Sequence, residues 1–250
     1  MRFLEFGNKE NKAIILIHGY SISWKMWIPQ IDVFSQEYFI IVPILDGHDT
    51  ENSSTFTTVE KAATDIINYV IQIYGNHIFA VCGASLGATI GIEILAQNRL
   101  NIDKAIIDAG PVVPTNKLLL KLIILFRYQQ AHGMKKGSKS IDYMLNQTNY
   151  PKGMNDEIKK VGGNMSDESC RNVHRSAFRY SIPASLKNVK TEIAYWYGSK
   201  EPKFMKKYAK AILRLKPNAH IKVFEGYAHG EMCIGDPEFY IDQATAFFQL

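Results

Sequence analysis

The chain has 250 residues, which is enough for one large α/β domain or for a core with a small lid, and two unrelated domains are not expected. Hydrophobic residues make up 46% of the chain and charged residues 21%, so extensive disorder is excluded. The net charge of +5 comes from scattered lysines rather than from a basic cluster, which argues against nucleic-acid binding. No stretch is long and apolar enough to span a membrane, so we expect no stable membrane insertion.

Cysteine usage indicates the redox environment of the protein. The chain has an odd number of cysteines, and the spacing of Cys82, Cys170 and Cys233 is not that of metal ligands. Cys82 lies in an apolar run, where it acts as a small hydrophobic residue. The first six residues lack the charged, apolar and cleavage regions of a signal peptide. We therefore expect a reduced, cytoplasmic protein, and no residue pattern predicts a metal ion or another cofactor.

An apolar run over residues 12–18 predicts a strand that is buried on both faces of a parallel sheet. The run ends at His18, Gly19 and Tyr20, where the glycine permits a tight turn. The backbone N–H of Tyr20 is a candidate donor to an oxyanion. For His18 we favour a structural role that braces the loop over a role in proton transfer.

Three further elements come before the central motif. Apolar residues at helical spacing predict a helix over 21–35, and the apolar run 39–44 predicts a second strand. The loop after this strand contains His48, for which no spacing partner indicates a metal site. A capping box that begins at Thr57 predicts an amphipathic helix that continues to Tyr74.

Residues 78–91 have the pattern of a short buried strand, a tight turn with one serine, and the start of a helix. The turn matches the Gly-x-Ser-x-Gly nucleophile elbow, with Ser85 between Gly83 and Gly87. Such a turn lifts the serine hydroxyl above the sheet, and the free N–H groups at the helix start favour the negative charge of acyl transfer. Leu86 would supply one of these N–H groups. We favour this interpretation over a Gly-rich junction with a surface serine.

The strand predicted over 104–108 is followed by a change in the character of the sequence. From residue 111 to residue 183 helical pieces replace the alternation of strands and helices, which indicates an insertion over the sheet edge that carries the serine. We therefore predict an α/β fold: a mostly parallel sheet with helices on both faces, formed by residues 1–110 and 184–250, and a helical lid over 111–183.

Two features of the predicted lid leave its function open. The apolar stretch 118–126 fits a lid that binds acyl groups, a patch on a membrane surface, or a helix packed within the insert. Ser166 is an N-cap for a helix that carries Arg171, Arg175 and Arg179 along one face. For these arginines we favour a solvated face over a clamp for an anionic substrate.

The alternation resumes with a strand over 192–197, which Glu201 follows, and a strand over 221–224, which His229 follows in a glycine-containing loop. The carboxyl ends of parallel strands meet at one edge of a sheet, so we expect both side chains to lie close to Ser85. The order of serine, acid and histidine along the chain predicts a nucleophile, an orienting acid and a general base.

Glu201 is the acid that would fix the tautomer of His229. Glu225 and Glu231 flank the histidine but have the pattern of surface charges.

Together these features resemble the α/β-hydrolase superfamily, and within it the carboxylesterase and monoacylglycerol-lipase-like serine hydrolases. The resemblance rests on the His-Gly pair at 18–19, the elbow at 83–87, the Gly-x-x-acid pattern at 198–201 and the His229 loop. The Pro-x-Leu-x-Gly-His pattern at 43–48 is similar to a loop of these families. The resemblance implies a mostly parallel eight-stranded sheet, shortened here at the N-terminus, with a helical lid between its sixth and seventh strands. The family acid is most often aspartate, so the glutamate is a departure.

The resemblance also implies a rival to Glu201. Some members of the family place their acid at the end of the strand after the elbow, which makes Asp108 the alternative acid. A carboxylate one methylene longer than aspartate can still accept the histidine N–H, and we favour Glu201.

The leading hypothesis is a serine hydrolase that cleaves a carboxylic ester or thioester of a small to medium acyl group through an acyl-Ser85 intermediate. A first alternative is a hydrolase or lyase that acts on a C–C bond or lactone of an anionic metabolite held by the lid arginines. A second alternative is a non-catalytic receptor or scaffold on the same fold. The complete set of serine, acid and histidine argues against this alternative. The expected partner is a small-molecule substrate, and the sequence leaves its identity and the oligomeric state open.

Overall fold

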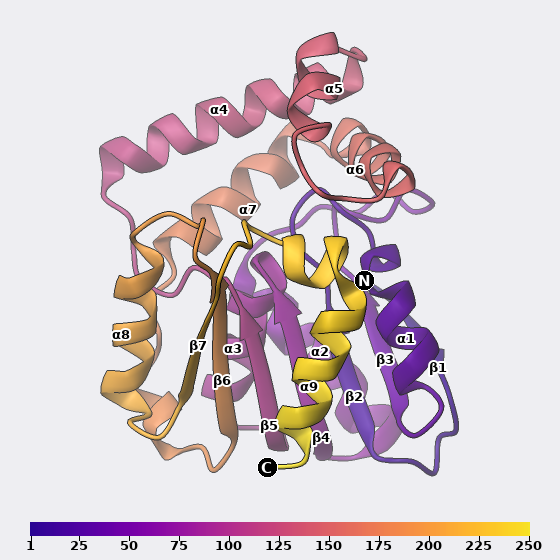
Figure 1. Cartoon of the computed structure of the whole chain (residues 1–250), viewed down its shortest axis with the longest axis vertical. Helices are drawn as coiled ribbons and strands as arrows, with labels where there is room; N and C mark the ends of the chain where they lie inside the picture. Colours follow the sequence, from indigo (N-terminus) through magenta and orange to yellow (C-terminus); the bar gives the residue numbers. More distant parts are fainter.

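A mostly parallel sheet organises the molecule. The computed structural model describes residues 1–250, apart from the side chain of Lys152. Within these residues the sheet has seven strands in the order β1-β3-β2-β4-β5-β6-β7, with β1 antiparallel to β3 and all other neighbours parallel (Figure 1). The strands are β1 (Arg2–Phe6), β2 (Ala13–Ile17), β3 (Phe39–Ile44), β4 (His77–Ala84), β5 (Asn101–Asp108), β6 (Glu192–Gly198) and β7 (His220–Phe224).

Helices cover both faces of this sheet (Figure 1). The helices of the core are α1 (Ile28–Phe34), α2 (Val59–Tyr74), α3 (Leu86–Gln97), α8 (Met205–Leu215) and α9 (Pro237–Phe248). Ile14 and Leu16 of β2 pack in one cluster with α1 and α9, whereas Ile15 and Ile17 pack in another with α2, α3 and α8. Successive side chains of a strand point to opposite faces, so a strand covered on both sides is apolar throughout. The predicted mostly parallel sheet with helices on both faces is confirmed.

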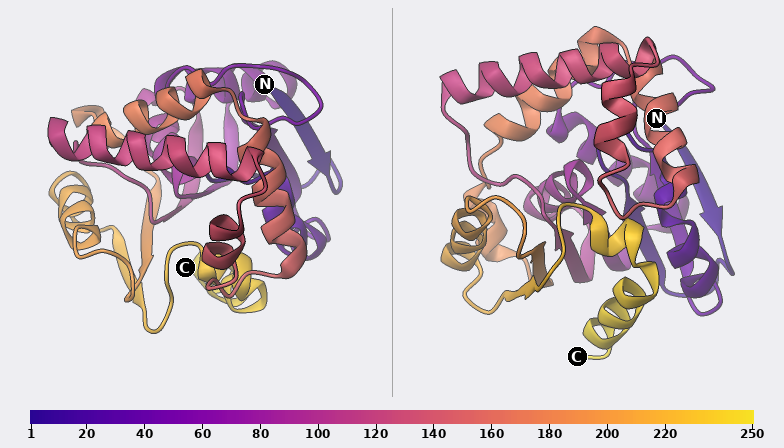
Figure 2. Two further views of the ribbon diagram at one scale, coloured as in Figure 1. Left: turned by 90° about the horizontal axis from the view of Figure 1, so that it is seen from above. Right: turned by 45° about the horizontal axis from the view of Figure 1, so that its top comes forward.

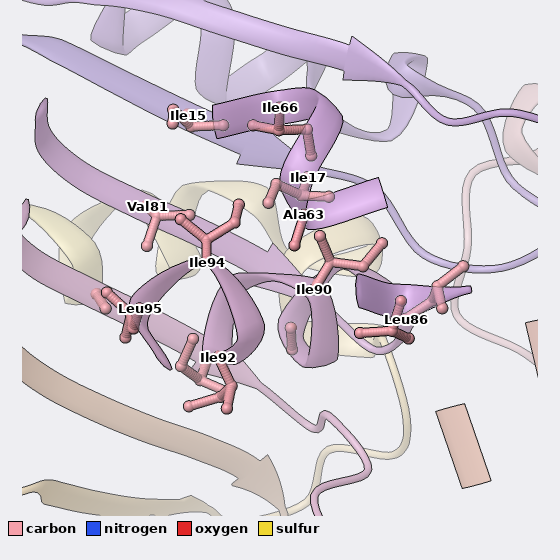
Figure 3. Packing of buried hydrophobic residues seen from close by; sticks show 14 of the residues in the cluster. Ile15, Ile17, Ala63, Ile66, Val81, Leu86, Ile90, Ile92, Ile94 and Leu95 are labelled. Atoms are coloured by element: carbon pink, nitrogen blue, oxygen red, sulfur yellow. The ribbon is translucent and has the colours of Figure 1, made fainter. Parts of the chain in front are cut away.

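Helix α3 is buried almost all round. Every residue from Leu86 to Ala96 is buried, and Figure 3 shows Ile90 and Ile94 of this helix in one cluster with Val81 of β4. Burying an aliphatic side chain of this size stabilises the folded state by about 1.5–3 kcal/mol relative to leaving it exposed. The packing therefore holds the first residue of α3, directly after Ser85, in a fixed position on the sheet.

The structure describes four α-helices between β5 and β6. They are α4 (Lys117–Lys135), α5 (Lys139–Leu145), α6 (Lys152–Asn164) and α7 (Asp167–Arg179). Figures 1 and 2 show α4, α5 and α6 together at one end of the sheet. Helix α7 lies closer to the core, because its buried Val173 and Ala177 belong to the same cluster as α2 and α3.

The apolar stretch 118–126 lies on α4 with most of its large side chains in solvent. Leu118 is 71% exposed, Leu122 is 56% exposed and Phe126 is 55% exposed, whereas Leu120 is buried. The interpretation of this stretch as a helix packed within the insert is wrong for the exposed side chains, because packing would remove them from water. In the described part of the chain no helix, α4 included, combines the length and apolar character needed to cross a bilayer.

The predicted single helix over 21–35 is wrong. The structure has a short 3-10 helix, η1 (Trp24–Trp27), followed by α1. Ser21 has a φ of 58°, which an α-helix does not allow, and the side chain of Ser23 caps η1 instead. The apolar spacing remains correct, since Trp27, Ile31 and Phe34 are buried in the cluster that covers one face of the sheet.

Helix α2 begins one residue later than the sequence pattern predicts. Its N-cap is Thr58, whose Oγ1 accepts a hydrogen bond from the backbone N–H of Lys61 at 3.1 Å, rather than Thr57. Thr58 has the extended backbone that an N-cap requires. The predicted continuation of this helix to Tyr74 is confirmed.

Candidate active site

Ser85 occupies the sharp turn between β4 and α3. Its backbone has a φ of 54° and a ψ of −112°, a conformation that residues with side chains rarely adopt. Two glycines make the turn possible. A Cβ on Gly83 would lie 2.3 Å from the carbonyl oxygen of Gly87, and a Cβ on Gly87 would lie 2.1 Å from that of Ile17. Any side chain at either position would push the strand and the helix apart, so the turn depends on both glycines.

The side chains of Ser85, His229 and Glu201 form one hydrogen-bonded chain. Nε2 of His229 lies 2.9 Å from Oγ of Ser85, and Nδ1 lies 2.8 Å from Oε2 of Glu201. Oε1 of Glu201 accepts a hydrogen bond from the backbone N–H of Gly198 at 3.0 Å. A carboxylate only accepts, so Nδ1 carries the proton and the lone pair of Nε2 faces the serine hydroxyl. The structure thus brings together the three residues that the sequence pointed to.

Two opposing effects set the pKa of His229. Burial lowers this pKa, whereas the hydrogen bond to Glu201 and its negative charge raise it, and the net result lies above the ordinary histidine value. The Glu201 side chain is 1% exposed, so little water screens its charge. A more basic imidazole withdraws a proton from a hydroxyl more effectively.

Asp108, the alternative acid, lies near this chain without joining it. Among the described residues no hydrogen bond links its carboxyl to His229, although its backbone oxygen accepts one from the N–H of Ser85 at 2.7 Å. Burial, together with the charge of Glu201, raises the pKa of Asp108 to about 7. A carboxyl that is partly protonated at neutral pH is a poorer partner for an imidazolium, so both geometry and charge favour Glu201.

Two side chains for which the sequence predicted no role hold the loop of His229. Glu231 is buried, and its carboxylate accepts a hydrogen bond from the N–H of Ala228 at 2.8 Å, so the prediction of a surface charge is wrong at this position. Glu225 is exposed, as predicted. The hydroxyl of Tyr150, between α5 and α6, donates to the carbonyl oxygen of His229 at 2.7 Å. These contacts fix the backbone on either side of the imidazole.

Two backbone N–H groups next to Ser85 have no acceptor among the described residues. They belong to Leu86, the first residue of α3, and to Tyr20, in the loop after β2. This loop lies against the serine, since a Cβ on Gly19 would lie 3.6 Å from the Cβ of Ser85. The arrangement can donate two hydrogen bonds to an oxygen that becomes negative during acyl transfer.

Several solved structures share this fold over nearly the whole chain. A hydrolase from Pseudomonas aeruginosa has a TM-score of 0.80 at 12% identity, over 99% of this chain and 94% of that chain. A carboxylesterase structure from Nitrososphaera gargenis has a TM-score of 0.78 at 16% identity, over 99% and 93%. An enol-lactonase from Burkholderia xenovorans has a TM-score of 0.75 at 13% identity, over 100% and 96%. Likenesses at these identities show a common fold.

A family model described as the alpha/beta hydrolase fold matches residues 12–135. The chain belongs to the α/β-hydrolase superfamily. The matched region contains the β2 loop and the whole strand–turn–helix around Ser85. No curated protein matches the chain in a sequence comparison.

A buried histidine braces the loop that carries Tyr20 in this α/β hydrolase. Nε2 of His18 accepts a hydrogen bond from the N–H of Leu45 at 3.1 Å, and Nδ1 donates to the carbonyl oxygen of Gly19 at 2.9 Å. These partners require a neutral ring, and burial lowers the pKa of His18 to about 4. The ring ties the loop after β2 to the loop after β3, which is the structural role that the sequence favoured.

Two more buried histidines surround the ring of Tyr20. The ring centroid of His174 lies 4.3 Å from that of Tyr20, and the centroid of His48 lies 6.0 Å away on the β3 loop. Burial lowers the pKa of His174 to about 4 and that of His48 to about 3. The loop that carries the Tyr20 N–H is therefore packed by neutral imidazoles.

A cavity of about 360 Å³ opens beside Ser85, between the core and the insert. Its wall is mostly apolar, with large side chains from Met26, Met134, Met144, Leu145, Phe178 and Met205. Among the described side chains, none from 118–126 lines it, so the interpretation of that stretch as an acyl-binding lid is wrong for these residues. Nor does any group of three or more His, Cys, Asp or Glu in the described chain have an arrangement that could hold a metal ion.

The cation in this cavity comes from α4 rather than from α7. Arg171, Arg175 and Arg179 are exposed and do not line the cavity, which agrees with the solvated face that the sequence favoured. Arg127 and Gln130 line it instead. Sequence reasoning missed Arg127, because no motif shows which face of α4 turns toward Ser85. The spacing of Arg127 and Gln130 by three residues, which puts them on one helix face, was the available signal.

We expect acidification to destabilise this α/β hydrolase through its buried histidines. An unfolded histidine binds a proton near pH 6.5, whereas folded His48 binds one near pH 3. As the pH falls below 6.5 the unfolded state takes up protons first, so stability is full above this pH and falls below it. Each such histidine costs about 1.4 kcal/mol of unfolding free energy per pH unit.

Urea unfolding at several pH values measures this effect. Between about pH 5.5 and pH 4.5, His48→Phe should reduce the slope of unfolding free energy against pH by about 1.4 kcal/mol per unit. Phenylalanine retains the ring packing against His18 and Phe56, and above about pH 7 the two proteins should have the same slope. An unchanged slope in the acidic range would contradict a neutral, buried His48.

Proposed function

We propose that the protein is a serine hydrolase that cleaves a carboxylic ester or thioester of a small to medium acyl group through an acyl-Ser85 intermediate. One observation carries this proposal: the hydrogen-bonded chain from Ser85 Oγ through His229 to Glu201 opens into an apolar cavity beside two free backbone N–H groups. Acyl transfer requires this combination of a nucleophile, an oriented base and oxyanion donors.

In the first half-reaction Oγ of Ser85 attacks the carbonyl carbon while its proton passes to Nε2 of His229. The carbonyl oxygen becomes an oxyanion and accepts hydrogen bonds from the N–H groups of Tyr20 and Leu86. Glu201 stays ionised and stabilises the imidazolium through Nδ1–H. When the tetrahedral intermediate collapses, the bond to the alcohol or thiol breaks, and His229 gives that leaving group its proton. The acyl group remains on Ser85.

In the second half-reaction water replaces the leaving group. His229, neutral again, takes a proton from water as the water oxygen attacks the acyl carbon. The same two N–H groups stabilise the second oxyanion. Collapse of this intermediate breaks the bond to Ser85 Oγ, and His229 returns its proton to the serine. The products are a carboxylic acid and the regenerated hydroxyl.

The cavity supports the substrate class. Its mostly apolar wall removes water from an acyl chain, and its volume of about 360 Å³ fits a small to medium group. The similarity to the carboxylesterase structure from Nitrososphaera gargenis also supports an ester substrate. Esters and thioesters present the same planar carbonyl to Ser85, so the same chemistry serves both.

Hydrolysis of p-nitrophenyl butyrate tests the proposed function. Ser85→Ala removes the nucleophile, so kcat/KM should fall by at least about 10⁴-fold while the circular dichroism spectrum is retained. Mass spectrometry of wild-type protein quenched during turnover should show a butyryl group on the peptide that contains Ser85. Ser53→Ala, a change at an exposed loop serine, is the matched control and should leave turnover unchanged. Turnover that survives in Ser85→Ala would contradict the proposal, and no acylation with any p-nitrophenyl ester would favour a non-catalytic scaffold.

A comparison of Glu201→Gln with Asp108→Asn assigns the acid. Glutamine cannot accept the Nδ1–H as a carboxylate does, so kcat should fall by about 10³- to 10⁴-fold, whereas Asp108→Asn should cost less than about 10-fold. The residual activity of Glu201→Gln should persist to lower pH, because the charge that raises the pKa of His229 is gone. Rates measured with one ester from pH 5 to pH 9 give both results. A larger loss in Asp108→Asn would reverse the assignment.

A further inference from the structure

Arg127 puts an unpaired positive charge into the wall of the Ser85 cavity. Its side chain is partly buried and lines the same cavity as the serine. Within the described part of the chain it forms no ion pair, in contrast to Arg2, which pairs with Asp49 and Glu51. A charge removed from water is costly unless an opposite charge or hydrogen bonds compensate, and burial lowers the pKa of Arg127 for this reason. The fold therefore keeps a cation in a mostly apolar cavity at a cost in stability.

One edge of the Arg127 guanidinium is free. Nη1 donates to Oε1 of Gln130 at 2.9 Å, and Gln130 is itself buried with its Nε2 2.9 Å from Sδ of Met144. This contact fixes the orientation of the guanidinium plane. Nε and Nη2 have no acceptor among the described residues. Neither atom belongs to the fully buried polar side-chain atoms that lack a hydrogen-bond partner. Their two N–H groups form the fork that binds both oxygens of a carboxylate.

The groups around Arg127 do not neutralise its charge. The titratable groups that raise the pKa of Arg127 are the phenols of Tyr20 and Tyr150 and the thiol of Cys170. Burial raises the pKa of both phenols and of the thiol, so all three stay protonated at neutral pH. The neighbours are polar but uncharged, and the guanidinium keeps its full charge toward the cavity.

The catalytic imidazole lies within the electrostatic reach of Arg127. The positive charge of the guanidinium lowers the pKa of His229 and that of His174. The carboxylate of Glu201 binds Nδ1, on the other side of the His229 ring from Ser85. An acyl group in the cavity therefore meets a free cation from α4, whereas the carboxylate of Glu201, which also lines the cavity, already accepts hydrogen bonds from His229 and Gly198.

We propose that Arg127 is a specificity-determining residue and that the acyl group carries a carboxylate, which Nε and Nη2 of Arg127 bind while Ser85 attacks the carbonyl carbon. This inference rests on the proposed function, because it names the substrate class of the same site. In both half-reactions the carboxylate of such an acyl group supplies the acceptors that Nε and Nη2 of Arg127 lack among the described residues. A neutral acyl group of equal length leaves the cation unpaired, and the loss of charge-assisted hydrogen bonds then discriminates against it.

The experiment compares esters that differ only in charge. The substrates are the mono-p-nitrophenyl esters of succinate, glutarate and adipate, each beside its methyl ester. For at least one length, wild-type kcat/KM should be about 10-fold or more higher for the anionic ester. Arg127→Met should lower this preference by about 10- to 100-fold, mainly through KM, because the contact is made in both the ground and transition states. Arg127→Lys should retain part of it.

The matched control is Arg171→Met, which removes an exposed arginine of α7 that lies outside the cavity. This variant should keep the wild-type preference. A wild-type preference for the neutral ester at all three lengths would overturn the proposal. So would a preference that Arg127→Met leaves within about twofold of the wild-type value.

Binding without turnover separates this proposal from the proposed function. Calorimetry with succinate, glutarate and adipate on Ser85→Ala should give an affinity that falls about 10-fold or more when Arg127→Met is added. If wild type hydrolyses no ester but this binding still depends on Arg127, the serine-hydrolase proposal fails and the carboxylate site stands. If esters are hydrolysed but all three acids bind both proteins equally, the carboxylate site fails alone.

Discussion

The conformation of Ser85 depends on the close approach of three backbone segments. Strands β2 and β4 and helix α3 come so near to one another that neither Gly83 nor Gly87 has room for a Cβ. The serine is held at a φ of 54° in front of a helix that is buried almost all round. Such a conformation costs about 1–3 kcal/mol, which the burial of only one or two aliphatic side chains of α3 offsets. The position of the hydroxyl, the free N–H of Leu86 and the contact with His229 all result from this turn.

Burial acts on the charges of the site in different ways. It keeps His18, His48 and His174 neutral, so that they pack against or brace the loop that carries Tyr20, and it raises the pKa of Asp108 toward neutrality. The side chain of Glu201 is also buried, and its carboxylate accepts hydrogen bonds from Gly198 and His229. The cavity is thus left with a carboxylate behind the imidazole and a guanidinium on α4.

The sequence predicted the core and the central site because their signals are local. Gly-x-Ser-x-Gly needs five residues, and Glu201 and His229 follow apolar strands whose carboxyl ends must share an edge. Residues 111–183 contain no local motif that predicts which side chains face the serine. Which face of α4 turns toward Ser85 depends on packing with α6 and α7, so the sequence did not reveal Arg127 and left the role of the exposed stretch 118–126 open. Tyr150 and Glu231 act through backbone contacts that only the folded loops create.

A crystal structure of the protein after reaction with an alkyl phosphonate ester of p-nitrophenol tests the nucleophile, the base and the oxyanion donors together. We expect phosphorus bonded to Oγ of Ser85, with one phosphonyl oxygen within hydrogen-bond distance of the backbone nitrogens of Tyr20 and Leu86. His229 should remain bound to Glu201, and the alkyl chain should occupy the cavity beside Met134. A phosphonate on another residue, or one whose oxygens point away from both N–H groups, would contradict the role assigned to this turn.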